Sequence, residues 1–289
     1  AVLVPRADEH QGEYVPPSAE RLKWLSGFAG SAGQLAVTAK AAVLFVDGRY
    51  TLQARGQIDM STFEVVNSAD RKVTAWLADT LARGAVVGFD PWLHTVQEVA
   101  GLREALAAKG VKLKPLARNP VDSVRGRDRP GPPTGAVAVH PVSLAGQAAE
   151  DKIAALQGAL RKAGEDAAIL TRPDSIAWAL NIRGADIAHT PTPLAFAILH
   201  AGAKPELFIA PAKLDAAARA YLTALVRLRE PSGRTIERNV TLPVGLAGPA
   251  IGIKPLFTGS LGQGELAPFD VAVFDASGKP QAAKGLKWQ

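Results

Sequence analysis

The segment between Glu13 and Tyr50 constrains the fold most strongly, because it joins a helix, a glycine-spaced loop and two short apolar strands. Leu22 and Leu25 repeat at helical spacing, and we expect the Ser18 hydroxyl to cap the start of this helix. Residues 35–37 and 42–46 are apolar runs typical of adjacent strands. A helix that leads into paired strands favours an α/β layer.

Three glycines, Gly27, Gly30 and Gly33, separate this helix from the first strand. A dinucleotide-binding loop follows a strand and opens a helix, whereas here the helix comes first. We therefore expect a tight glycine turn that allows close packing, at a contact between subunits. Asp47, Arg49 and Tyr50 follow the second strand, where we expect a helix cap and a surface ion pair.

The remaining periodicity divides the chain into two α/β units and a tail. Residues 1–122 alternate strands with helices and form the first expected domain, and residues 144–233 form the second. We expect residues 123–143 to form a linker between the domains, and we expect no regular element over the proline-rich residues 119–143. Residues 118–129 are the densest basic stretch and could contact phosphates, although a solvated linker is the favoured interpretation. Residues 234–289 are expected to be β-rich, with a strand at 269–274 followed by a turn and a second strand within 282–288.

Individual helices and strands follow from the same patterns. The expected strands are 62–66, 86–89, 111–116, 167–171, 194–199 and 206–209, and the expected helices are 69–83, 94–109, 148–163, 173–180 and 214–228.

Composition excludes several classes of protein. The 289 residues contain no cysteine, which rules out disulfides, thiolate metal sites and a cysteine nucleophile. The net charge of +6 is a weak signal for nucleic acid, so we expect no nucleic-acid partner. No apolar run is long enough to span a bilayer and no secretory signal is visible, so we expect no membrane association.

Candidate site residues are few. None of the five histidines forms a one-turn pair with another histidine or a carboxylate, so the spacing supports neither a metal site nor a catalytic residue. Arg183, Asp186 and His189 share one loop, where they either line a cleft or form a turn held by a local Arg–Asp pair. Spacing alone favours the turn. The tryptophans at 24, 76, 92 and 178 are expected in the core.

Three sequence segments resemble aminopeptidase P, the Xaa-Pro aminopeptidase of the three-domain cytosolic type. They are YVPPSAERLKWLSGFAGSAG, LFVDGRY and TRPDSIAWALNIRGADIAHTPTPLAFAIL. The resemblance implies two creatinase-N-terminal-like α/β domains, each with a mixed sheet flanked by helices, the second of them incomplete because the likeness ends at about residue 233. It implies a cytoplasmic homodimer in which these domains restrict substrate access, and on this basis Arg183, Asp186 and His189 are candidate access residues.

In this metallopeptidase family, two divalent metals, usually manganese, are held in a third domain by two Asp, one His and two Glu. Neither Asp270 nor Asp275 is followed by the required His and Glu residues, so the resemblance implies no catalytic residue, no metal ligand and no cofactor in this chain. Proline-containing peptides would be substrates only if a catalytic domain were supplied.

The tail from about residue 234 resembles a fragment of a bacterial alpha-2-macroglobulin-like domain. Two other interpretations therefore stay open: a stand-alone interaction or scaffold module, or a fusion fragment without peptidase activity. A periplasmic binding role is a weaker third.

Overall fold

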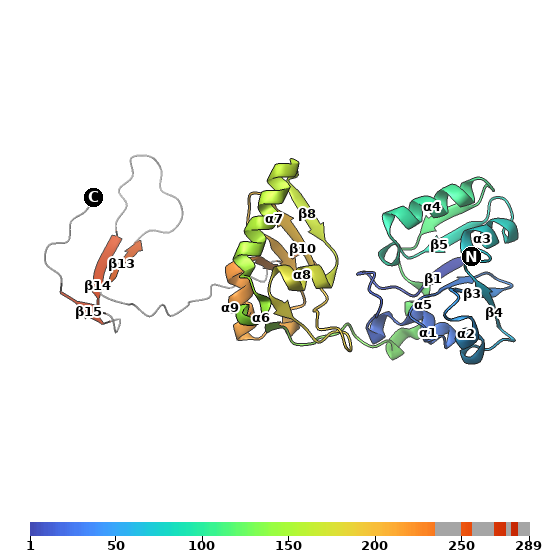
Figure 1. Cartoon of the computed structure of the whole chain (residues 1–289), viewed down its shortest axis with the longest axis horizontal. Helices are drawn as coiled ribbons and strands as arrows, with labels where there is room; N and C mark the ends of the chain where they lie inside the picture. Colours follow the sequence, from blue (N-terminus) through green and yellow to red (C-terminus); the bar gives the residue numbers. More distant parts are fainter. Residues whose placement is uncertain (235–249, 256–268, 276–278, 283–289) are drawn as a thin grey trace. The chain divides into compact units, whose positions relative to one another are not determined.

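The computed structural model describes residues 1–234, 250–255, 269–275 and 279–282 (Figure 1). The chain divides into two compact units, Ala1–Glu237 and Arg238–Gln289, which are described separately below. The first unit contains two sheet-and-helix lobes. We call residues 1–128 lobe I and residues 137–229 lobe II.

Lobe I is built on a six-stranded sheet with the order β4-β3-β2-β1-β5-β6. β2 runs antiparallel to both of its neighbours, and the other neighbouring strands are parallel. The strands are β1 (Val2–Pro5), β2 (Gln34–Val37), β3 (Ala42–Val46), β4 (Phe63–Asn67), β5 (Val86–Phe89) and β6 (Lys112–Pro115). The helices are α1 (Arg21–Ser26), α2 (Thr51–Gln57), α3 (Val73–Thr80), α4 (Val96–Ala107) and α5 (Pro120–Arg125), with short 3-10 turns η1 (Pro17–Ala19), η2 (Pro91–Leu93) and η3 (Gly126–Asp128).

Helices cover both faces of this sheet, as Figure 1 shows. Successive strand residues point to opposite faces, and neighbours such as Leu3 and Val4 accordingly enter different hydrophobic clusters. One cluster packs the sheet against α3 and α4 through Leu77 and Leu106. The other packs it against α1, α2 and α5. Lobe I is therefore a three-layer α/β sandwich.

Lobe II has a smaller sheet with the order β12-β11-β10-β8. Its strands are β8 (Ala167–Leu170), β10 (Phe196–His200), β11 (Glu206–Phe208) and β12 (Arg227–Arg229), and a separate ribbon pairs β7 (Ala138–Val139) with β9 (Ile182–Arg183). Its helices are α6 (Val142–Ala145), α7 (Ala149–Ala163), α8 (Pro173–Ala179) and α9 (Ala216–Leu225), with a turn η4 (Pro211–Lys213). A single cluster that includes Ile153, Ile176, Leu207 and Leu222 joins α7, α8 and α9 to the sheet.

The described part of the second unit is an antiparallel three-stranded sheet. β13 (Ala250–Pro255) pairs with β14 (Phe269–Phe274), which pairs with β15 (Pro280–Gln281). The predicted strand at 269–274 is present, whereas β13 was not predicted. A second tail strand was predicted within residues 282–288, and residues 283–288 lie outside the described residues. Most of the segment said to resemble the alpha-2-macroglobulin-like fragment also lies outside them.

The prediction that the proline-rich stretch has no regular structure is wrong. α5 begins with Pro120, because proline fits the first helical position, where its missing N–H costs nothing. The Asn119 side chain accepts a hydrogen bond from Val121 N at 3.0 Å, and Val121 packs into the core of lobe I. η3, β7 and α6 also fall partly or wholly within the expected linker.

Two further local predictions are wrong. Ser18 lies inside η1, and the residue before α1 is Glu20, whose side chain makes no capping bond. The helix expected to reach residue 228 ends at Leu225, because Arg227–Arg229 pairs with β11 and buries Leu228.

Three of the four tryptophans expected in the core are exposed. Trp76 is buried, but Trp24, Trp92 and Trp178 are 42%, 71% and 52% exposed. Arg125 lies over the Trp24 ring, and Lys152 over the Trp178 ring, at 5.8 and 4.7 Å from the ring centroids. Cation–π contact therefore gives two of these rings a partner at the surface. No helix among the described residues combines the length and apolarity that crossing a membrane requires.

Candidate functional site

The glycine loop is closed over the ring of Phe28, which is fully buried. Gly27 ends α1 in the left-handed conformation with φ of 83°, a conformation that favours glycine. A Cβ atom at Gly30 would lie 2.2 Å from Cζ of Phe28, and one at Gly33 would lie 3.0 Å from the same ring. The second and third glycines therefore let the backbone lie against an aromatic side chain.

Asp47, Arg49 and Tyr50 lie beside this loop and make contact with it through Ser31. Ser31 Oγ and Tyr50 Oη are 2.8 Å apart, and this hydrogen bond lowers the pKa of Tyr50. The Tyr50 ring meets Phe28 edge-on at 5.7 Å. Sequence reasoning named the loop and the Asp47–Tyr50 segment separately, and Ser31 is the residue that joins them.

The predicted ion pair between Asp47 and Arg49 is present at the surface. Arg49 Nη2 donates to Asp47 Oδ2 at 2.7 Å, and Nε donates to Oδ1 at 3.1 Å. These bonds hold the pKa of Asp47 below its ordinary value. The expected helix cap is wrong: α2 begins at Thr51, its N-cap position is Tyr50, and no side chain caps it, while Asp47 Oδ1 accepts from Arg49 N within the preceding turn. Arg49 lies over the Tyr50 ring, 5.1 Å from its centroid.

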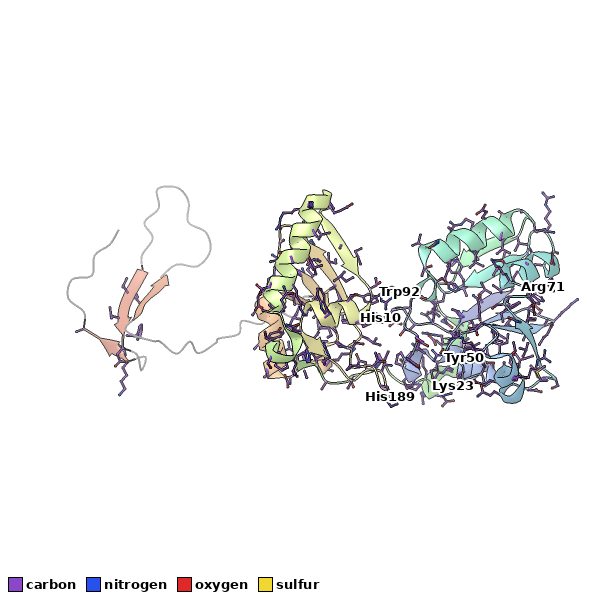
Figure 2. The ribbon with its side chains drawn as sticks, viewed as in Figure 1. His10, Lys23, Tyr50, Arg71, Trp92 and His189 are labelled. Atoms are coloured by element: carbon purple, nitrogen blue, oxygen red, sulfur yellow. The ribbon has the colours of Figure 1, made fainter. Side chains whose placement is uncertain are left out.

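The structure separates the roles of Arg183, Asp186 and His189. Asp186 is buried, and its Oδ2 accepts from Lys213 Nζ at 2.6 Å and from Leu194 N at 2.6 Å. Arg183 donates to the backbone oxygen of Ile182. His189 is exposed, with φ of 62° (Figure 2). The expected local Arg–Asp pair is wrong, because Asp186 forms an internal ion pair with Lys213 and Arg183 bonds to the backbone. Lys213 lies far along the chain and gave no signal in the sequence.

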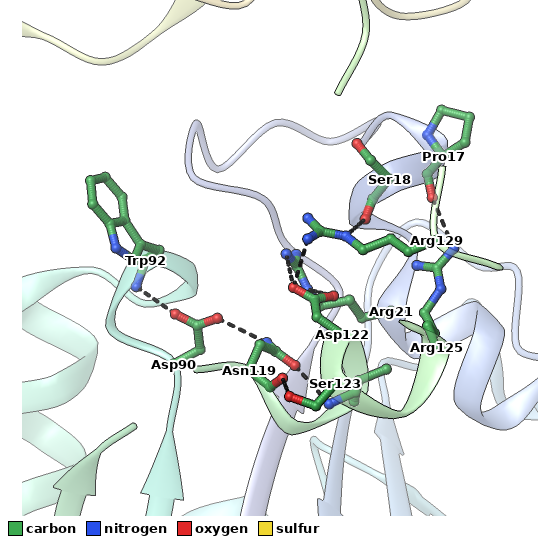
Figure 3. Close-up of polar contacts among 11 residues, drawn as sticks. Pro17, Ser18, Arg21, Asp90, Trp92, Asn119, Asp122, Ser123, Arg125 and Arg129 are labelled. Atoms are coloured by element: carbon green, nitrogen blue, oxygen red, sulfur yellow. Dashed lines mark hydrogen bonds and ion pairs between the residues drawn. The ribbon is translucent and has the colours of Figure 1, made fainter. Parts of the chain in front are cut away.

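A polar cluster surrounds α5 in lobe I (Figure 3). Arg21 donates from Nε and Nη2 to the two oxygens of Asp122 at 2.8 and 2.9 Å. Arg129 Nη1 lies 3.2 Å from Asp122 Oδ2. Asn119 Nδ2 donates to Asp90 Oδ2 at 2.8 Å, and Asp90 Oδ1 accepts from Trp92 N. This cluster ties α5 to α1 and to the turn that carries Trp92.

A pocket of about 910 Å³ adjoins this cluster and is lined by residues of both lobes. Its apolar walls include Trp92, Ile169, Phe196 and Phe208. His10 from lobe I stacks on Phe196, with 4.3 Å between ring centroids, and its Nδ1 lies 3.2 Å from the Thr171 oxygen. Sequence reasoning missed the pocket, because its walls come from residues far apart in the chain.

Residues 8–126 match one family model of the creatinase/prolidase N-terminal domain, and residues 128–241 match a second. Lobes I and II therefore belong to the creatinase/prolidase N-terminal domain family. The mixed α/β sheets flanked by helices agree with that fold, as predicted from the resemblance.

The particular relatives are Xaa-Pro aminopeptidases. The chain is 40% identical over 230 residues to a probable Xaa-Pro aminopeptidase P of Coccidioides posadasii, which covers 78% of this chain and 37% of the relative. It is 38% identical over 229 residues to the corresponding protein of Paracoccidioides lutzii, again with 78% and 37% coverage. This chain corresponds to the amino-terminal part of Xaa-Pro aminopeptidase-like proteins and spans less than two fifths of the length of these relatives.

A solved structure supports the same assignment. The X-prolyl aminopeptidase of Caenorhabditis elegans, described as a cytosolic enzyme with a di-nuclear active site, matches 80% of this chain and 38% of its own. The sequence identity is 33% and the TM-score is 0.76.

A two-metal centre does not fit the residues that the structure describes. Among them, no three His, Asp or Glu side chains are grouped so that they could hold a metal ion. We therefore derive no metal-dependent step from these residues.

Proposed function

We propose that this chain serves as the non-catalytic amino-terminal portion of an Xaa-Pro aminopeptidase, where it supports dimerisation and restricts substrate access. The observation that carries the proposal is the likeness of the chain to the Caenorhabditis elegans enzyme, with a TM-score of 0.76 over 80% of this chain. In the proposal, the two divalent metals belong to a catalytic domain outside the described residues, and the site of action is the cytoplasm.

The peptidase part of the proposal is tested with the purified chain, added manganese and a peptide whose second residue is proline. We expect no release of the N-terminal residue, because hydrolysis of this kind relies on a metal that activates water. A complete Xaa-Pro aminopeptidase is assayed in parallel. Rapid, manganese-dependent release by this chain would contradict the proposal.

The dimer is tested by light scattering of the purified chain after size-exclusion chromatography. We expect twice the chain mass of 30.2 kDa. A monomer at every concentration tested would contradict a dimerising role.

Substrate access requires a chimera, in which residues 1–241 replace the matching part of the Coccidioides posadasii relative. We expect the chimera to cleave a peptide with proline in second place and to discriminate against alanine there. Loss of this discrimination in a folded, active chimera would remove the access role. In the chimera, Arg183→Ala and His189→Ala test two of the three candidate access residues. The third, Asp186, is left unchanged because it forms the buried ion pair with Lys213.

One observation favours a second function, that of an interaction module. Trp92 and Ile169 are 71% and 74% exposed and both line the pocket shared by the two lobes. Large exposed apolar side chains in one place often mark a binding surface. A stable dimer that binds a separately expressed catalytic chain without itself cleaving peptides would support this function over the first.

A further inference from the structure

A second cavity, of about 560 Å³, lies wholly within lobe I and has no part in the functions proposed above. It is found at the edge of the sheet where β1 ends and β2 begins. In open α/β sheets, ligands commonly bind outside the carboxyl ends of the parallel strands. The polar residues that line the cavity are Arg6, Gln11, Ser31, Gln34, Lys72, Thr74, His94 and Glu98.

Arg6 brings a buried positive charge that is poorly neutralised. Its side chain is only 6% exposed, and its Nη1 has no hydrogen-bond acceptor among the described residues. The carboxylate oxygen nearest to its guanidinium, Glu20 Oε1, is 4.0 Å from Nη2, and the other oxygen of Glu20 pairs with Lys23 at 3.1 Å. Burying a donor without an acceptor is costly, so an oxyanion in the cavity would supply what Arg6 lacks.

His94, a second lining residue, has an unpartnered ring nitrogen of the opposite kind, an acceptor instead of a donor. Its Nδ1 lies 2.9 Å from the backbone oxygen of Asp90, which can only accept, so Nδ1 carries the proton of the neutral ring. In the neutral ring Nε2 then carries a lone pair, and this atom has no hydrogen-bond partner among the described residues. A ligand that satisfies both Arg6 and His94 needs acceptor oxygens and one O–H group.

α3 adds further positive potential. The helix begins at Val73 after Lys72, which makes no side-chain capping bond. Its first N–H groups therefore have neither an intrahelical acceptor nor a side-chain cap, and the helix dipole favours an anion there. The one carboxylate among the polar lining residues, Glu98, accepts from Thr95 N at 2.7 Å in the capping box of α4.

We propose that this cavity binds a phosphate group that keeps one P–O–H, as monohydrogen phosphate or as the singly charged end of a small phosphate monoester. Monohydrogen phosphate has acceptor oxygens for Arg6, Lys72 and the start of α3, and it has an O–H group that can donate to His94 Nε2. A carboxylate has no such proton, and sulfate at neutral pH has the tetrahedral shape without it. The glycine loop borders this site through Ser31 and Gly33, although the phosphate is held by other elements.

Calorimetric titration of the purified full chain tests the proposal, with inorganic phosphate, glycerol phosphate, sulfate and acetate at matched ionic strength. We expect phosphate to bind more tightly than sulfate and acetate by about tenfold, the effect of one hydrogen bond to a charged group. Tighter binding of glycerol phosphate than of phosphate would identify a monoester as the ligand, and the reverse order would identify the free ion.

Matched variants distinguish phosphate binding in the cavity from nonspecific attraction of the anion to a positively charged surface. Lys72→Ala and Lys40→Ala each remove one exposed lysine charge, but only Lys72 lines the cavity. We expect Lys72→Ala to weaken phosphate binding about threefold and Lys40→Ala to leave it unchanged. His94→Phe keeps a ring against Phe89 and should reduce the affinity for phosphate to that for sulfate.

Arg6→Gln should abolish most of the affinity, and circular dichroism shows whether this variant is folded. If Arg6→Gln fails to fold, the two lysine variants decide the question. Equal affinity for phosphate and sulfate in the unaltered chain, or equal loss in Lys72→Ala and Lys40→Ala, would overturn the proposal. The readout is binding and not peptide cleavage, so it does not depend on the function proposed above.

Discussion

At the scale of single residues, the strongest constraint is the buried pair of Asp186 and Lys213. Their side chains are 0% and 5% exposed, and they are 2.6 Å apart. Lys213 also donates to the Leu194 oxygen, and Asp186 accepts from Gly135 N. The pair therefore joins η4 to the loop after β9 and to the segment just before lobe II. It fixes the conformation of the loop that also carries His189.

Removing one member of this pair should be far more damaging than removing both. Asp186→Leu leaves the Lys213 charge buried and should lower the free energy of unfolding by about 3–5 kcal/mol. The double variant Asp186→Leu with Lys213→Met should recover much of that loss. Urea denaturation measures both. For comparison, Arg49→Ala breaks an exposed pair and should change stability by less than about 1 kcal/mol; equal losses in the two single variants would refute the distinction.

A second residue-scale prediction concerns Gly30. A methyl group there would lie 2.2 Å from the buried Phe28 ring, so Gly30→Ala must displace that ring and should cost about 1–3 kcal/mol. Gly48→Ala, where nothing lies within 4 Å, is the matched control and should be close to neutral. Thermal unfolding of the two variants compares them, and a neutral Gly30→Ala would mean that the loop does not depend on close packing.

At the scale of elements, side-chain pairs reinforce the backbone pairing of neighbouring strands. In lobe II, Glu206 on β11 accepts from Arg229 Nε on β12 at 2.8 Å and lies 3.4 Å from His200 Nε2 on β10. One carboxylate thus makes contact with both neighbouring strands of a four-stranded sheet. In lobe I the corresponding reinforcement comes from helix packing on both faces, because its strands carry apolar residues in both directions.

The bonds of Glu206 give lobe II a pH dependence with a definite sign. The hydrogen bond from Arg229 holds the pKa of Glu206 below its ordinary value of 4.5. The folded state therefore gains stability well above pH 4.5, and that gain is lost as the pH falls through the lowered pKa. We expect Glu206→Gln to be less stable than the unaltered chain at pH 7 and to show a smaller difference at pH 3. Urea denaturation of both chains between pH 3 and pH 7 measures the difference in their free energies of unfolding. If this difference did not change with pH, Glu206 would not titrate as described.

At the scale of the whole molecule, the described hydrophobic core lies within the first unit. The three hydrophobic clusters consist of residues between Ala1 and Leu228. The family models that match the two lobes end at residues 126 and 241. Among the described residues, no member of these clusters belongs to the second unit.

We therefore predict that a fragment of residues 1–241 folds on its own. Its melting temperature should lie within about 4 °C of that of the full chain, the shift that about 1 kcal/mol produces at this size. Differential scanning calorimetry of both chains makes the comparison. Loss of a cooperative transition in the fragment would show that residues 242–289 contribute to the core.

Local patterns in the sequence were sufficient for most of the regular structure. α7, β5 and β14 lie where apolar periodicity and glycine stops place them, because these signals act between residues that are near in the chain. The resemblance of the motifs led to the correct domain family. The exposed pair of Asp47 and Arg49 also followed from sequence, since its members are two residues apart.

Tertiary structure alone decided what depends on distant partners. β12 is a strand because β11 lies beside it, and α5 is held against the sheet of lobe I because Val121 packs into its core. Asp186 is buried because Lys213 meets it, and Arg6 and His94 line one cavity although 88 positions separate them. Periodicity records which face of an element is apolar, but it does not record which distant residue will cover that face or neutralise a buried charge.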